Sequence, residues 1–181
     1  GVADANGWAT SLGDVDVFWE AVGPSIEKAL KKMVAMRRRE GKAMVQTMKA
    51  ILRKFPSQIS NIQKLSTVSV EHYRKRLSDR ISEILDNGSV SHERLEEEVA
   101  IFAEKSDVTE EFCRLNSHVD EFSRTLGLDE PIGKRLNFIL QEMNREVNTI
   151  GSKCSEFSIT STVILLKEEI EKLREMVQNA E

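Results

Sequence analysis

Hydrophobic residues recur every three or four positions along most of the chain, which is the period of amphipathic helices. Residues 133–153 carry one continuous stripe, made of Leu136, Ile139, Leu140, Met143, Val147 and Ile150. A second stripe has the heptad spacing suited to bundle or coiled-coil packing, and it consists of Ile159, Val163, Leu166, Ile170, Leu173 and Val177. We therefore predict helices at about 91–105, 108–126, 132–152 and 159–179.

The first half of the chain predicts a long helical arm or hairpin over residues 24–88. Pro24 suits its first turn, and an apolar stripe continues from Ile26 to Ile62. We expect Pro56 to kink this helix, a Ser-Thr-Val-Ser run after Leu65 to interrupt it, and Asn87-Gly88 to close it. A stripe of this length must be covered, either by the C-terminal helices or by another subunit.

These patterns predict an all-α protein in which a long basic helical arm precedes an antiparallel helical bundle. Residues 1–23 form a linker and lead-in helix, residues 24–88 the arm, and residues 89–181 the helical core. Three prolines, nine glycines and a single Tyr point away from a β-rich fold. No apolar run approaches the roughly 20 residues of a membrane span. The sequence contains no Gly-rich phosphate loop or zinc-type Cys/His cluster, which argues against nucleotide-binding and zinc proteins.

Charge is strongly segregated along the sequence. Residues 28–80 hold 15 Lys and Arg against three acids, a net charge of +12, whereas the remaining residues carry −16. A basic arm joined to an acidic body suits an enzyme that binds a polyanion with the help of a cation. A solvated helix face explains the basic arm equally well.

The helix over residues 133–153 also carries an unusual polar face. Gln141, Asn144, Arg145 and Asn148 follow one another at helical spacing. Amides are mediocre helix formers, so three on one short face suggest specific hydrogen bonding. Glu142 and Glu146 form a neighbouring row, and two carboxylates four residues apart could ligate one hard cation. The alternative is that Glu142 forms a structural ion pair with Arg145.

A second polar row lies on the helix predicted for residues 108–126. Glu111, Arg114 and His118 share it with Asp107, and together they offer carboxylates for a cation, a guanidinium for phosphate and an imidazole for proton transfer. Each has a structural alternative. Asp107 and Glu110 match a capping box, Glu110 and Arg114 match an i,i+4 ion pair, and a lone helical histidine is more often structural.

Several motifs resemble the C-terminal region of the YicC-like endoribonuclease family. The strongest is GKRLNFILQEMNREVNTIGSK at residues 133–153, supported by residues 94–122, residues 166–181 and the R-x-x-E-G element within residues 36–44. The resemblance implies a bacterial cytoplasmic protein that cuts single-stranded RNA with a divalent cation, Mg²⁺ or Mn²⁺. It also implies self-association into a ring-like homo-oligomer, by resemblance a hexamer. Asn137 departs from the family's usual Asp, and the family's separate N-terminal α/β domain is expected to be missing from this chain.

The resemblance turns the polar rows into a predicted site. The predicted metal ligands are Glu98, Glu142 and Glu146, and the predicted catalytic residues are His118, Glu111, Arg114 and Glu142. The predicted RNA-binding residues are Arg135, Gln141, Asn144, Arg145, Asn148 and Lys153. We expect base stacking to contribute little, because most Phe residues fall on apolar stripes. The competing hypothesis is a non-catalytic RNA-binding or oligomer-assembly module, in which the same polar residues connect subunits.

Overall fold

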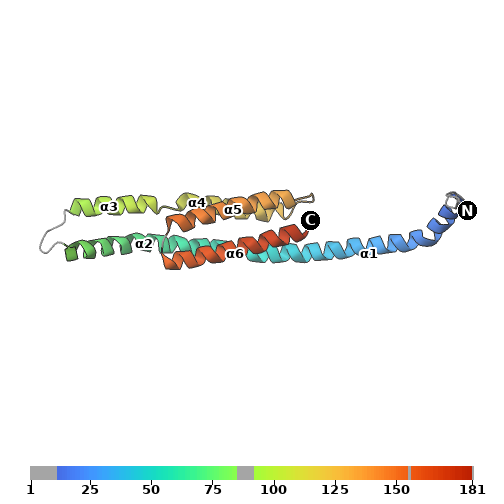
Figure 1. Ribbon diagram of the computed structural model, residues 1–181, viewed down its shortest axis with the longest axis horizontal. Coiled ribbons are helices and arrows are strands. Elements are labelled where there is room, and N and C mark those ends of the chain that lie inside the picture. The colour runs from blue at the N-terminus through green and yellow to red at the C-terminus, as the bar shows by residue number, and fades with distance from the viewer. Residues whose placement is uncertain (1–11, 85–91, 155, 181) are drawn as a thin grey trace, which may run out of the picture. The chain divides into compact units, whose positions relative to one another are not determined.

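The computed structural model describes residues 12–84, 92–154 and 156–180, and all of its regular elements within these ranges are α-helices (Figure 1). The all-α prediction is confirmed. The four predicted C-terminal helices occur close to their predicted bounds. The helices are α1 (Leu12–Leu52), α2 (Phe55–Ile84), α3 (His92–Lys105), α4 (Thr109–Thr125), α5 (Gly133–Lys153) and α6 (Phe157–Ala180).

The chain forms two compact units, Gly1–Met44 and Val45–Glu181. The division falls inside α1, so the predicted arm of residues 24–88 contributes to both units. Its second part, from Val45 onward, packs with the C-terminal helices because α2 contacts α3, α4 and α6.

The core of the second unit lies between α4, α5 and α6, where consecutive helices run side by side (Figure 1). Every member of the two apolar stripes predicted for residues 133–153 and 159–179 is buried, with exposed fractions of 4% or less. On α4, the facing residues are also buried, namely Phe112, Leu115, Val119 and Phe122. Side-chain periodicity thus determines which face of each helix enters the core.

The end of α1 and the start of α2 complete this core. Their stripe is covered by the C-terminal helices, one of the two predicted alternatives, and its buried members are Met48, Ile51, Leu52, Phe55, Ile59 and Ile62. The helix is interrupted at Arg53 and Lys54, and Pro56 follows as the second residue of α2. Proline is tolerated there because first-turn N–H groups have no helical partner.

Two predicted features of the arm are wrong. The first helix starts at Leu12, which places Pro24 inside it rather than in its first turn. The Ser-Thr-Val-Ser run after Leu65 does not interrupt α2. There, Thr67 Oγ1 donates a hydrogen bond to the Gln63 carbonyl at 3.2 Å and Ser69 is buried, so the run is accommodated within the helix. The predicted cap at Asn87-Gly88 lies outside the described residues.

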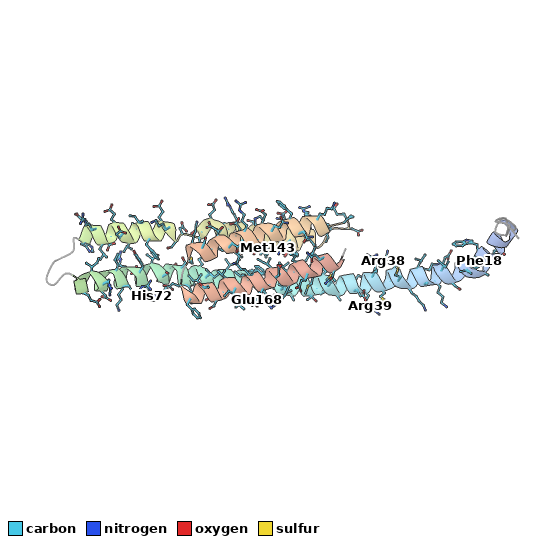
Figure 2. All side chains as sticks on the ribbon, in the orientation of Figure 1. Phe18, Arg38, Arg39, His72, Met143 and Glu168 are labelled. Atoms are coloured by element: carbon cyan, nitrogen blue, oxygen red, sulfur yellow. The ribbon has the colours of Figure 1, made fainter. Side chains whose placement is uncertain are left out.

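The first unit leaves its apolar residues uncovered within the described part of the unit. Leu30 and Met33, which belong to the predicted stripe, are about half exposed at 51% and 50%. Basic side chains, including Arg38 and Arg39, project from the same helix (Figure 2). Within the described helices, no stretch combines the length and hydrophobicity that a bilayer span requires.

We predict that Leu140→Ala destabilises the second unit by about 2–5 kcal/mol, because Leu140 is fully buried and its truncation leaves a cavity. Urea unfolding followed by circular dichroism measures the change. Ile164→Ala on α6 is the control, since Ile164 is 52% exposed and its truncation should change stability by less than about 0.5 kcal/mol. Equal effects of the two substitutions would contradict the proposed core.

Candidate functional site

A polar seam follows the contact between α4 and α5. The two helices bury their apolar stripes against each other, so the polar residues that flank these stripes meet across the interface. Ion pairs join Glu111 to Lys153 at 2.8 Å, Arg114 to Glu146 at 4.0 Å and Glu121 to Arg135 at 3.2 Å. Residue numbers rise on α4 as they fall on α5, which shows that the two helices are antiparallel.

Three predicted site residues converge in the middle of this seam. His118 of α4 meets Glu142 and Glu146 of α5, and one potential ligand atom from each residue lies within 4.8 Å of the other two. Glu142 and Glu146 are one turn apart and therefore share a face of α5. His118 and Glu142 are partly buried, and Glu146 is only 4% exposed.

The ligand atoms of this cluster are not engaged in hydrogen bonds with the described residues. Among the described residues, Glu142 has one ion-pair partner, Arg145 at 3.8 Å, and Glu146 has one, Arg114 at 4.0 Å. Both distances exceed those of hydrogen bonds. None of these oxygens is among the fully enclosed side-chain atoms without a partner, so the carboxylates remain accessible from the groove. The donor set of two carboxylates and one imidazole is therefore available for a divalent cation.

Arg114 lies next to this cluster and is shared between two acids. It donates a hydrogen bond to Glu110 at 2.5 Å and lies 4.0 Å from Glu146. The pair with Glu110 is the i,i+4 ion pair that the sequence suggested as an alternative. Half of the Arg114 side chain remains exposed, at 54%, so its guanidinium can also reach an anion in the groove.

The end of the seam near the start of α4 is held by Lys153. Its Nζ donates to Glu111 Oε1 at 2.8 Å and to the Asp107 carbonyl at 2.9 Å. The hydrogen bond with Glu111 raises the pKa of Lys153, so the amine stays protonated. Glu111 is 6% exposed, and the structure places it with Lys153 rather than in the His118 cluster. Both residues thus have a structural partner, although sequence analysis assigned them to catalysis and RNA binding.

Asp107 acts at the start of α4. Its Oδ1 accepts hydrogen bonds from the backbone N–H and the hydroxyl of Thr109, at 2.9 and 2.6 Å, and the hydroxyl bond is the main reason that the pKa of Asp107 is lowered. Glu110 pairs with Arg114 instead of completing a capping box. The carboxylate therefore orients the first turn of α4.

The predicted RNA-binding residues lie mainly on the exposed side of α5. Gln141, Arg145 and Asn148 are exposed, whereas Asn144 is partly buried. Arg135 is paired with Glu121 at the far end of the seam. Glu98 is exposed on α3, and the structure does not bring it into the His118 cluster.

Phe138 on α5 is a candidate RNA-contacting residue that was not among those predicted from the sequence. Its side chain is 61% exposed, so it is not part of the apolar core. Gln141 and Arg145 follow it at three and seven residues, which places all three on one side of the helix. An exposed aromatic ring beside amide and guanidinium groups is suited to stacking on a base. Its position in the sequence could have indicated this exposure, because Phe138 falls outside the stripe formed by Leu136, Ile139 and Leu140.

Comparison with known proteins assigns the chain to a family, and the matched residues include the seam. Residues 62–181 match the family described as endoribonuclease YicC-like, C-terminal. The chain belongs to the YicC-like endoribonuclease family. The family match includes all of α3 to α6 and therefore every predicted site residue.

Two relatives support this membership. A protein of Clostridioides difficile (strain 630) named probable endoribonuclease YicC is 44% identical over 169 residues. A protein of Haemophilus influenzae (strain ATCC 51907 / DSM 11121 / KW20 / Rd) with the same name is 31% identical over 168 residues. Each alignment covers 93% of this chain and 58% of the relative, so the chain spans less than two thirds of the length of these relatives.

We predict that Lys153→Met destabilises the second unit by about 1–3 kcal/mol, because Glu111 would keep a buried charge without its partner. Urea unfolding near neutral pH measures the effect. In a double-mutant cycle, Lys153→Met combined with Glu111→Gln should cost less than the sum of the single changes. The pKa of Lys153 is raised in the folded state, so the amine loses its proton only at a pH above 10.5, the ordinary pKa of lysine. The coupling between Lys153 and Glu111 should therefore be lost only above that pH. Additive effects would show that the pair does not stabilise the fold.

Proposed function

We propose that the α4–α5 seam is the catalytic region of a metal-dependent endoribonuclease that cleaves single-stranded RNA. The main support is the convergence of His118, Glu142 and Glu146, whose ligand atoms have no hydrogen-bond partner among the described residues. The two relatives are named probable endoribonucleases, which agrees with a phosphodiester substrate. Exposed amide and basic groups on the neighbouring face of α5 are suited to hold the RNA strand.

The geometry of the cluster fits a divalent cation. Two ligands of one Mg²⁺ ion, each at about 2.0–2.1 Å, lie at most about 4.2 Å apart. The three ligand atoms lie within 4.8 Å of one another, so small side-chain rotations bring them to bonding distance. Imidazole is a better ligand for transition metals than for Mg²⁺, whereas carboxylates suit both Mg²⁺ and Mn²⁺. Of the two cations expected from the sequence, Mn²⁺ is therefore favoured.

The residues around the cluster have separate tasks in cleavage. A bound cation would polarise the scissile phosphodiester and lower the pKa of water. The half-exposed guanidinium of Arg114 lies next to Glu146 and can stabilise the negative charge that develops on the phosphorus oxygens. Arg145, Gln141 and Asn148 present charge and amides to the phosphates, ribose hydroxyls and bases of the strand.

Replacement of Glu142 tests the proposed function. Glu142→Gln removes one carboxylate ligand while keeping the shape of the side chain, so Mn²⁺-dependent cleavage of a labelled single-stranded RNA should fall by at least about 100-fold. The melting temperature should change little, because Glu142 makes no hydrogen bond with the described residues. Glu168→Gln, which removes an exposed carboxylate of α6 outside the seam, is the matched control and should leave cleavage unchanged. RNA that is bound but never cut by the unmodified chain, with Mn²⁺, Mg²⁺ or chelator, would favour the non-catalytic binding module.

His118 has two possible tasks that exclude each other, as a metal ligand or as a proton donor and acceptor. The cluster favours the ligand, so His118→Ala should weaken Mn²⁺ binding about 10-fold or more, as measured by isothermal titration calorimetry. Unchanged Mn²⁺ affinity with lost cleavage would assign His118 to acid–base catalysis instead.

We also propose that the protein is cytoplasmic and self-associates into a ring-like homo-oligomer, by family resemblance a hexamer. The half-exposed Leu30 and Met33 support a contact with another subunit. Leu30→Glu should lower the native mass measured by light scattering without reducing helix content, whereas Lys32→Glu should not change the mass. The same mass for Leu30→Glu and the unmodified chain would exclude this helix face from the contact.

A further inference from the structure

A pocket lies in the same compact unit as the His118 cluster but does not include the residues of that cluster. It has a volume of about 580 Å³ and is formed where α2 faces the α3–α4 and α5–α6 junctions. This size is typical of pockets that hold small molecules or single nucleotides. His72, whose position on α2 is labelled in Figure 2, lies on its wall.

Polar groups without partners line this pocket. Ser69 and Ser106 are 7% and 6% exposed, and their hydroxyls form no hydrogen bond with the described residues. Neither hydroxyl oxygen is among the fully enclosed side-chain atoms without a partner, so both are open to solvent. Both residues line the cavity, so a polar ligand such as a ribose can replace water at their hydroxyls.

The pocket also offers positive charge. Arg76 is exposed on its wall and forms no ion pair with the described residues. Phe157 and Ser158 belong to the first turn of α6, whose N–H groups have no intrahelical partner and whose dipole favours an anion. Lys153 adds a cation that is shared with Glu111. One carboxylate, Glu156, opposes them and lies 3.7 Å from His72.

An unusual aromatic residue lies at the same place. Phe157 is 87% exposed, the largest exposed fraction among the exposed large hydrophobic side chains of the described residues. It lies beside the serines and Arg76, and not in the apolar core. Phe102, on another wall, is stacked on Tyr73 with ring centroids 3.9 Å apart, which fixes that side of the pocket. An exposed ring is costly in water but provides a stacking surface for a base.

From this combination we infer that the pocket binds one nucleotide of the RNA strand. Phe157 stacks on the base, Ser69 and Ser106 contact the ribose, and Arg76 together with the α6 N-terminus binds the phosphate. This inference rests on the proposed function. Lys153 connects the two sites, because it lines the pocket and lies seven residues, about 10 Å, from Glu146 along α5. The bound nucleotide therefore lies outside the scissile bond and positions the strand.

RNA binding measured under conditions that prevent cleavage tests whether the pocket holds a nucleotide. The affinity of the full chain for a fluorescein-labelled single-stranded RNA is measured by anisotropy in the presence of chelator, over a series of salt concentrations. Arg76→Gln should weaken binding about five-fold or more and reduce the slope of log affinity against log salt by about 0.7, the value for one lost phosphate contact on a single strand. Arg80→Gln is the matched control, because Arg80 lies one turn further along α2, outside the pocket.

Substitutions at Phe157 test the stacking. Phe157→Ala and Phe157→Leu should both weaken binding about five-fold or more, whereas Phe157→Tyr should keep it, because only Tyr retains a ring. Full binding by Phe157→Leu would show an apolar contact only and overturn the nucleotide assignment.

The two proposals fail in different ways. RNA binding that Arg76→Gln and Phe157→Ala leave unchanged would overturn the pocket, while loss of cleavage in Glu142→Gln would still support the metal site. An unmodified chain that neither binds nor cuts RNA would overturn both.

Discussion

The packing of α4 against α5 is the interaction on which the candidate site depends. Phe112, Leu115 and Val119 on one helix and Leu140, Met143 and Val147 on the other are almost completely buried. Removal of this apolar area from water fixes the rotation of each helix about its axis. The rotation of the two helices also determines which polar residues beside the stripes meet across the interface. It places His118 opposite Glu142 and Glu146. The convergence of these three side chains is thus a consequence of core packing, and a small shift of one helix along the other would separate them.

The same packing buries two carboxylates, and the structure treats them differently. Oε1 of Glu111 accepts a strong charge-assisted hydrogen bond from the Lys153 amine at 2.8 Å, whereas its Oε2 is buried without a hydrogen-bond partner. Glu146 has only the Arg114 guanidinium at 4.0 Å, too far for a hydrogen bond. The Glu146 carboxylate accepts no hydrogen bond from the described residues and is not fully enclosed, so beside His118 it is open to a ligand.

Periodicity was sufficient to predict the helices, because each stripe is read within one segment. The buried stripes of α5 and α6 match the predicted residues one by one.

The site was only partly predictable. Glu142 and Glu146 share a helix face and could be paired from spacing, but their contact with His118 depends on the register between α4 and α5, which no single stripe encodes. Glu98, Glu111 and Glu142 are all glutamates, so residue type could not show which of them belongs to the His118 cluster. Only the packing of the helices shows that Glu142 does. The pocket at Phe157 was not predictable, because it joins α2 to two helix junctions that lie far apart in the sequence.

Electrostatics suggest a division of tasks between the two sites. Glu142 and Glu146 repel phosphate as long as no cation lies between them, so the seam alone cannot hold RNA strongly. Arg76, the α6 N-terminus and the exposed ring of Phe157 would require no cation in order to bind a nucleotide. If both proposals hold, the strand is held first at the pocket and along the exposed face of α5, and the divalent cation then brings one phosphate to the acidic cluster. Binding and cleavage would accordingly respond to different variables, ionic strength for the former and divalent-cation concentration for the latter.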